Sequence, residues 1–261
     1  MNNNIIKLPL IETVTRSFMY VIKNITTVSK ISSIFLLLWF AEMLAGFPFL
    51  CSTDNAFCTT NISHSILAIL LYISSAIISI SVIRNIILKQ EYNFFHISAG
   101  FNLVKYIGYQ LLIAVMIIIP STLILMISQA SQSPDLSIFT KYFLGAAFIT
   151  TLIGLSIFCF RLYLVFAGSA INDKEMTLGR SYTLTKGNML SIFAGQVILA
   201  LPTIILLGII FSLYPLSNWG FIGNSIFVLA GLLCTFFDAA IKGSYYSHIY
   251  QYFMYYAKQD Q

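Results

Sequence analysis

Six apolar runs, each about as long as a lipid bilayer is thick, constrain this chain more than any other feature. A transmembrane helix needs roughly 20 predominantly apolar residues. Runs of this kind cover about residues 31–50, 65–88, 107–128, 142–167, 190–213 and 222–242. Only 9% of the residues are charged and 58% are hydrophobic, whereas a soluble domain carries about 25% charged residues. We therefore expect an all-α, polytopic membrane protein with six transmembrane helices.

The basic residues divide unequally between the two sides of such a layout. Of the 14 Lys and Arg residues, only Lys141 falls in a connection on one side of the membrane. The others precede the first span, follow the last, or lie in and beside the second and fourth connections. Basic residues accumulate in the cytoplasmic loops of membrane proteins. We therefore expect both termini to be cytoplasmic and residues 1–261 to form one integral membrane domain.

The cytoplasmic connections share a second pattern, in which apolar residues recur at helical spacing beside polar ones. The residues that form this pattern before spans one, three and five are Ile11, Val14, Phe18, Val21 and Ile25; Phe94, Ile97, Phe101 and Val104; and Leu178, Tyr182 and Met189. Such segments are typical of amphipathic helices that lie in the membrane interface. We therefore predict three helical-hairpin repeats, at 11–92, 93–174 and 175–256, each with an interfacial helix on the cytoplasmic side.

Several ionisable residues lie inside or at the edge of predicted spans. Glu42 is deep in the first span, where a carboxylate is costly and indicates function by default. It either carries a proton or a cationic group, or it is protonated and hydrogen-bonded to serines of span two. Asp238 and Lys242 are four residues apart and therefore share one helical face. Arg84, Arg161 and Lys242 mark the inner ends of spans two, four and six, where snorkelling toward phosphates is the ordinary interpretation.

The remaining chemistry-bearing residues indicate no catalytic or metal site. Cys51 and Cys58 share the first outer connection and either form a disulfide or remain free thiols. The three histidines do not have metal-ligand spacing, no known catalytic motif is present, and we expect no cofactor and no enzymatic activity. The absence of basic runs argues against nucleic-acid binding. The six tyrosines of residues 244–258 are typical of an aromatic belt at a membrane interface.

A polar elbow between spans four and five is the most distinctive local feature. In "GRSYTLTKGNMLSIF", residues 179–193, several polar residues run directly into an apolar stretch. We expect Asn172 and Glu175 to open a short helix, Gly187 to close it in a left-handed conformation and Asn188 to cap span five. The elbow is either only a helix junction or also a site for a lipid phosphate. The residues that we expect to bind lipid head groups here and in the other connections are Arg16, Lys23, Lys105, Arg180, Lys186 and Asn188.

At this elbow the chain resembles a known family. The segment 161–202 contains an Arg that ends a span, an Asp in the connection, a Ser and the run Leu-Thr-Lys-Gly-Asn. The matching residues are Arg161, Asp173, Ser181, Leu184, Thr185, Lys186, Gly187 and Asn188. This pattern resembles the YciC-like family of bacterial inner-membrane proteins and the membrane domain attached to some glycerophosphoryl diester phosphodiesterases. The resemblance implies a multi-pass protein of the bacterial inner membrane, without the phosphodiesterase domain.

These observations lead to one expected function and two alternatives. We expect a non-enzymatic envelope or scaffold protein whose partners are membrane lipids and other membrane proteins. The first alternative is a small-solute or ion-coupled transporter or channel with Glu42 on its pathway. The second is a membrane enzyme that modifies lipid.

Overall fold

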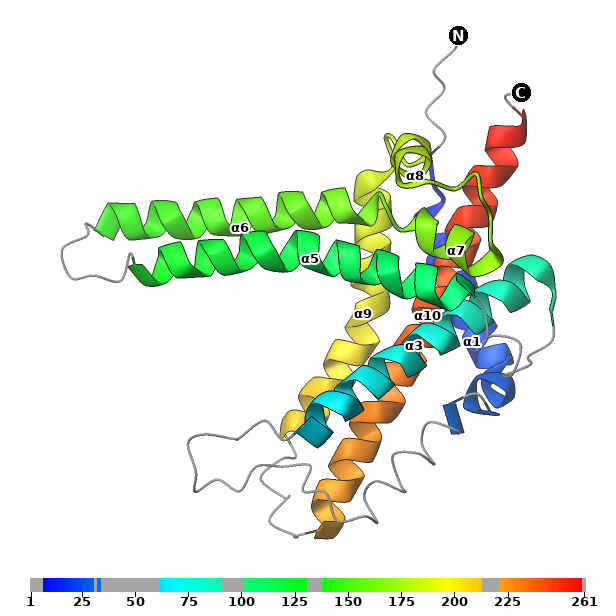
Figure 1. Ribbon diagram of the computed structural model, residues 1–261, viewed down its shortest axis with the longest axis horizontal. Coiled ribbons are helices and arrows are strands. Elements are labelled where there is room, and N and C mark those ends of the chain that lie inside the picture. Colours follow the sequence, from blue (N-terminus) through cyan, green and yellow to red (C-terminus); the bar gives the residue numbers. More distant parts are fainter. Residues whose placement is uncertain are drawn as a thin grey trace.

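The computed structural model describes residues 7–30, 32–33, 62–90, 101–130, 138–212 and 221–259. Within these ranges the chain forms helices and no strand, which confirms the all-α class for the described residues. The helices labelled in Figure 1 are α1 (Leu10–Lys23), α3 (Ile62–Leu88), α5 (Phe101–Ala130), α6 (Ile138–Phe160), α7 (Leu164–Ile171), α8 (Leu178–Leu184), α9 (Met189–Ser212) and α10 (Phe221–Gln259).

Five of the six predicted spans fall on these helices, with two differences in their extent. The fourth predicted span is interrupted, because α6 ends at Phe160 and the chain turns through residues 161–163 before α7 begins. The sixth continues beyond its predicted end, since α10 runs as one helix of 39 residues to Gln259. The first predicted span, 31–50, lies outside the described residues except for Ser32 and Ser33.

The helices converge at one end of the molecule and separate toward the other (Figure 1). The convergent end contains α1, residues 161–188 with helices α7 and α8, the last turns of α3, the first turns of α5 and the second half of α10; we call it the hub. The α5–α6 hairpin and α9 leave the hub in clearly different directions, and we call them the arms (Figure 1). Residues 7–9, the first that are described, and the last turns of α10 both lie at the hub.

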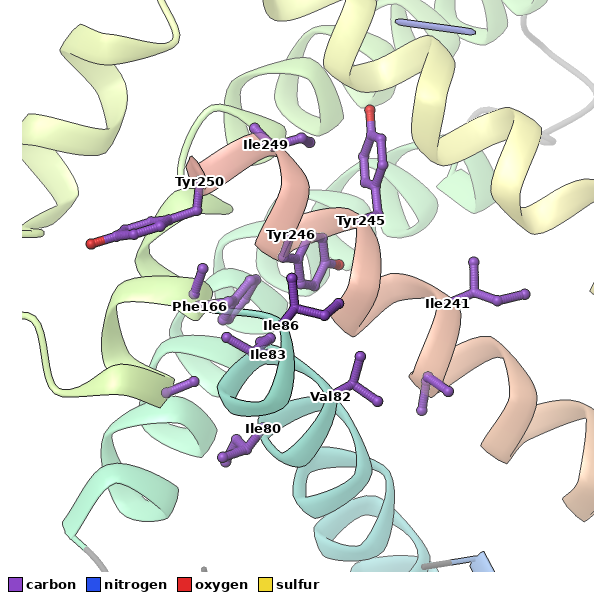
Figure 2. Packing of buried hydrophobic residues seen from close by; sticks show 14 of the residues in the cluster. Ile80, Val82, Ile83, Ile86, Phe166, Ile241, Tyr245, Tyr246, Ile249 and Tyr250 are labelled. Atoms are coloured by element: carbon purple, nitrogen blue, oxygen red, sulfur yellow. The ribbon is translucent and has the colours of Figure 1, made fainter. Parts of the chain in front are cut away.

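The centre of the hub is a close crossing of α3 and α10. Figure 2 shows the buried side chains of both helices around it, together with Phe166 of α7. The Ser79 hydroxyl of α3 donates a hydrogen bond of 2.9 Å to the Ala239 carbonyl of α10. A Cβ atom added to Gly243 would lie 2.8 Å from the Ser79 carbonyl oxygen, a separation that real Cβ atoms do not show. Glycine at position 243 therefore permits the two backbones to approach this closely.

Aromatic side chains fill the space between α5, α7 and α10. The ring centroids of Tyr106 and Phe166 are 5.2 Å apart, and those of Phe166 and Tyr246 are 5.5 Å apart. Tyr163 lies 5.2 Å from both Phe166 and Tyr246. These spacings fall in the range at which aromatic pairs attract beyond their area burial.

The tyrosine-rich segment is therefore part of the protein core to a greater extent than the sequence predicts. Tyr245, Tyr246 and Tyr250 are all buried, whereas an aromatic belt would place its rings at the membrane surface. The physical reason is the uninterrupted α10, which carries residues 245, 246, 249, 250 and 253 onto one face at helical spacing. Only Tyr255, which is 61% exposed, is positioned as a belt residue would be.

Helix α1 presents three different faces. Its buried face, formed by Thr13, Val14, Ser17 and Val21, packs against α9 and α10. A second face is apolar but exposed, with Ile11 79% and Ile22 53% accessible. The third carries the exposed cations Arg16 and Lys23. The predicted amphipathic helix is confirmed, although part of the predicted apolar stripe faces away from the protein.

Among the described residues, two stretches are long and apolar enough to cross a membrane; the first begins on the α6 arm and ends in α7 of the hub, and the second lies on the α9 arm. These are Gly145–Ile171, with a mean hydropathy of 2.0, and Met189–Ile209, with a mean hydropathy of 2.3. Within the 18-residue apolar window of each stretch, only 29% of the first and 22% of the second is buried within the protein. A core helix of a water-soluble domain buries its apolar stripe against neighbouring elements. These arms instead expose most of their apolar surface.

Candidate functional site

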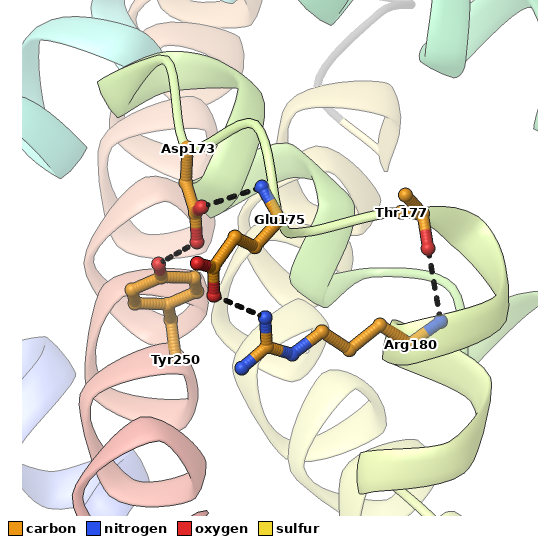
Figure 3. A network of polar contacts seen from close by, with 5 residues as sticks. All are labelled: Asp173, Glu175, Thr177, Arg180 and Tyr250. Atoms are coloured by element: carbon orange, nitrogen blue, oxygen red, sulfur yellow. Dashed lines mark hydrogen bonds and ion pairs between the residues drawn. The ribbon is translucent and has the colours of Figure 1, made fainter. Parts of the chain in front are cut away.

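The elbow, residues 172–188, joins α7 to α9 and contains α8. It begins with a left-handed turn. Asn172, at φ 60°, ends α7, and the Asp173 amide donates to the Gly168 carbonyl oxygen at 2.9 Å. One carboxylate oxygen of Asp173 accepts from the Glu175 amide at 2.9 Å, and the other accepts from the Tyr250 hydroxyl of α10 (Figure 3). Burial, and then the neighbouring Asp173 carboxylate, raise the pKa of Tyr250 above its usual value. The first residues of the elbow are therefore hydrogen-bonded to α10.

Helix α8 begins at Thr177 and not at Asn172. The Thr177 hydroxyl accepts from the Arg180 amide at 3.2 Å, as an N-cap residue does. Asn172 closes the preceding helix instead, because asparagine tolerates the left-handed conformation that this closing turn requires. Glu175 forms an ion pair of 2.5 Å with the Arg180 guanidinium (Figure 3). The predicted capping pair was therefore wrong in its residues, and Arg180, predicted to bind a lipid head group, has a carboxylate partner within the protein.

Arg161 joins the end of α6 to α8. Its carbonyl oxygen accepts hydrogen bonds from the Ser181 hydroxyl at 2.7 Å and from the Thr185 hydroxyl at 3.3 Å. Its guanidinium donates to the Tyr182 carbonyl oxygen and lies 3.4 Å above the Tyr182 ring centroid, a cation–π contact. Ser181 and Thr185 are fully buried. The hydroxyls of Ser181 and Thr185 thus satisfy the Arg161 carbonyl just beyond the end of α6.

The last part of the elbow joins α8 to α9 and to the amino-terminal segment. Gly187 has φ 81°, which confirms the predicted left-handed closing residue. Asn188 is 2% exposed, and its side-chain oxygen accepts a 2.6 Å hydrogen bond from the Leu8 amide. Asn188 thus precedes α9 as predicted. Its side chain also binds Leu8, which is 180 residues earlier in the sequence.

The other basic residues at predicted span ends have protein partners as well. Arg84 donates two hydrogen bonds, of 2.8 and 3.1 Å, to the Gln90 side-chain oxygen. Asp238 and Lys242 form the expected ion pair on one face of α10, with an Oδ2–Nζ distance of 2.5 Å. Snorkelling is therefore an incomplete description of Arg84, Arg161 and Lys242.

The residues predicted to bind lipid head groups differ in their availability. Arg16 forms an exposed ion pair with Glu12, and Arg180 forms one with Glu175. Lys23 and Lys186 are exposed, Lys105 is half-buried in the first turns of α5, and Asn188 is buried. All six belong to the hub, but they are divided among α1, α5, α8 and the turn before α9. Of the predicted lipid contacts in the elbow, Lys186 is exposed, whereas Arg180 is paired with Glu175 and Asn188 is buried.

Some predicted site residues cannot be placed. Glu42, Cys51 and Cys58 lie outside the described residues. Among the residues that are described, no group of three or more His, Cys, Asp or Glu side chains could hold a metal ion.

Sequence reasoning missed the part of the hub contributed by the second half of α10. Tyr250 holds the elbow through Asp173, and Tyr252 donates a 2.7 Å hydrogen bond to the Lys7 carbonyl oxygen. The signal that indicates this role is the spacing of Tyr246, Ile249, Tyr250 and Phe253, which places them on the core face of a helix.

Comparisons of this chain with protein-family models, with curated proteins and with solved structures find no match. The function must therefore be argued from the residues of the hub and the surfaces of the arms.

Proposed function

We propose that this protein is a multi-pass membrane protein of the bacterial inner membrane that engages lipid head groups, without catalysis, through its hub. The proposal includes six spans, three hairpin repeats, cytoplasmic termini and membership of the YciC-like family. The observation that carries it is the contrast between the exposed apolar arms and the polar, cationic hub.

The arms support the membrane location by their surface. The exposed apolar residues of α9 include Val197, Ile198, Leu201, Ile204, Ile205, Leu206 and Ile209. A soluble monomer rarely exposes a contiguous apolar patch of this kind, because its hydration is unfavourable. Lipid chains remove that cost.

The hub supports lipid engagement by its charge. It contains Arg16, Lys23, Arg180 and Lys186, and the positive-inside rule places such residues beside anionic cytoplasmic head groups. Lys186 is exposed at the turn that precedes α9. A phosphate bound there would also approach the amides at the start of α9, which have no partner within that helix.

The orientation is tested by reporter fusions. A reporter at residue 180 should be cytoplasmic and one at residue 55 should be on the opposite side. The same compartment for both reporters would contradict the proposed topology.

Lipid engagement is tested by native mass spectrometry of the purified full-length protein. The wild type should retain anionic phospholipid, and Arg180→Gln combined with Lys186→Gln should remove it. Lys141→Gln on α6, which removes one positive charge from the predicted opposite side, is the control and should have no effect. Because Glu175 competes for Arg180, Glu175→Gln should increase retention. Unchanged retention in all variants would overturn the proposal.

A further inference from the structure

A pocket of about 290 Å³ lies between α1 and the second half of α10, away from the elbow. Its α1 side contains Glu12, Thr13 and Arg16, and its α10 side contains His248 and Gln251 together with a group of tyrosines. None of the predicted lipid contacts except Arg16 belongs to it. The pocket is therefore a second, separately built feature of the hub.

One wall of the pocket presents two opposite charges. Glu12 and Arg16 are one helical turn apart and form a 2.5 Å ion pair, with 55% and 65% of their side chains exposed. Exposed pairs of this kind contribute little to stability. Each partner can therefore be exchanged for a charged group of a ligand at small cost. Their offset along the helix axis is about 6 Å, which suits two charges within one small molecule.

The opposite wall supplies a buried polar atom that has no partner. No hydrogen bond to the His248 Nε2 atom is present among the described residues. Burial, and then the positive charges of Arg16 and Lys89, lower the pKa of His248 to about 4. The imidazole is therefore neutral near pH 7 and can exchange one hydrogen bond with a ligand. A buried polar atom of this kind is costly to leave unpaired.

Three tyrosine rings complete the pocket. The centroids of Tyr252 and Tyr256 are 4.8 Å apart, and those of Tyr255 and Tyr256 are 5.4 Å apart. All three residues line the pocket. Aromatic faces attract ammonium groups within about 6 Å of the ring centroid. The tyrosines thus add a binding surface for a cation beside the Glu12 carboxylate.

We propose that this α1–α10 pocket binds a zwitterionic amine–phosphate group, as in the head group of phosphatidylethanolamine. The phosphate lies at Arg16, with His248 or Gln251 as a further hydrogen-bond partner. The ammonium lies at Glu12 and the tyrosine rings. The inference rests on the proposed function, because it assigns one hub site to one class of head group.

A purely anionic head group fits this pocket less well. It would satisfy Arg16 but leave the Glu12 carboxylate without its partner and close to a second negative charge. Like charges at short range disfavour binding. The pocket therefore selects for a molecule that carries both charges, in contrast to the exposed Lys186 of the elbow.

Native mass spectrometry of the full-length protein tests this selectivity. The full-length Arg180→Gln, Lys186→Gln protein, in which the proposed anionic-lipid site of the elbow is removed, is equilibrated with equal amounts of dioleoyl phosphatidylethanolamine and dioleoyl phosphatidylglycerol in mixed micelles. We expect the zwitterionic lipid to be retained preferentially, and Arg16→Gln and Glu12→Gln each to reduce its retention about tenfold, because each removes a charge-assisted contact. Lys30→Gln, which removes an exposed positive charge outside the pocket, is the matched control. The exchange Glu12→Arg with Arg16→Glu keeps the net charge and the i, i+4 pair, and should also remove the preference.

The outcomes separate this inference from the proposed function. Equal retention of both lipids overturns the inference, and so does a preference that survives all three pocket variants. The proposed function still stands in either case if lipid retention at the elbow continues to depend on Lys186. A wild-type protein that retains neither lipid overturns both this inference and the proposed function. A parallel experiment with free phosphoethanolamine shows whether the natural ligand is a lipid or a soluble molecule. If phosphoethanolamine displaces the lipid at equal concentration, the pocket binds the amine–phosphate group of a soluble ligand. Each variant is first checked for unchanged thermal unfolding, which its exposed position predicts.

Discussion

The hub and the arms are built from similar apolar helices but use them in different ways. At the hub, α3 and α10 cross so closely that Gly243 has no room for a side chain, and buried polar groups find partners on distant segments. On the arms, α9 exposes most of its isoleucines and leucines. The same residue types therefore stabilise contacts between helices in one region and contacts with the surroundings in the other. The effect of a substitution on stability or insertion therefore depends on whether the residue contacts another helix or the surroundings, more than on the composition of the region.

The largest expected effect comes from placing a charge on an arm. Leu201 lies at the middle of α9 and is 45% exposed. If lipid surrounds it, Leu201→Lys should cost about 3 kcal/mol of insertion free energy and sharply reduce the yield in the membrane fraction. Thr183→Lys, at an exposed position of α8, is the control and should leave the yield unchanged. Equal yields of the two variants would remove the distinction between arm and hub.

A smaller but still substantial effect is expected at the α3–α10 crossing. Gly243→Ala places a Cβ atom 2.8 Å from the Ser79 carbonyl oxygen and should destabilise the protein by about 2 kcal/mol, because both backbones must separate. The same change at Gly231, on the same helix, meets nothing within 4 Å and should be neutral or slightly stabilising. Thermal unfolding of the purified protein measures both variants. A similar midpoint for the two would show that the crossing is looser than described.

Removing the polar connection between α9 and the amino-terminal segment should have an intermediate effect. Asn188→Ala leaves the Leu8 amide without its acceptor and should cost about 1–2 kcal/mol. Limited proteolysis should then cleave the segment before α1 faster than in the wild type. Thr183→Ala removes only a local hydrogen bond to Gly179 and serves as control. An unchanged cleavage rate in Asn188→Ala would indicate that other contacts hold the segment.

The smallest effect concerns pH and sharpens the description of the hub. His248 has a pKa of about 4 in the folded protein and about 6.5 when unfolded, so the unfolded chain binds the additional proton between these values. Stability should therefore be constant above about pH 6.5 and fall as the pH is lowered, by at most about 1 kcal/mol at about pH 5.5. His248→Gln should remove this part of the pH dependence of the unfolding midpoint. An identical pH profile in the variant would contradict the burial of this imidazole.

The sequence predicts the helices of this protein better than the contacts between them. Uninterrupted apolar runs suffice to locate α3, α5 and α9, and the left-handed Gly187 and the Asp238–Lys242 pair follow from local rules. The break at Arg161 could not be predicted in this way, because its carbonyl is satisfied by residues 20 and 24 positions later. The role of the tyrosines was missed for a related reason. Composition does not distinguish a ring that faces lipid from one that faces α7.

The pocket between α1 and α10 is still further from what local rules can predict. Glu12 and His248 lie near opposite ends of the chain, and neither has a motif around it. Only the docking of α1 on α10 brings them to one cavity. Of the predicted lipid-binding residues, Arg180 and Asn188 have partners within the protein, which leaves Lys186 as the clearest candidate of the elbow.

The hydrogen bond between Leu8 and Asn188 also has a consequence for the order in which the chain is made. The acceptor is synthesised 180 residues after the donor, and the Tyr252 hydroxyl that binds Lys7 follows 245 residues after its own partner. During translation the segment before α1 therefore cannot form these two hydrogen bonds until residues 188 and 252 have been synthesised. Its attachment is a closing step of biogenesis, and nascent chains arrested before residue 188 should leave that segment open to protease.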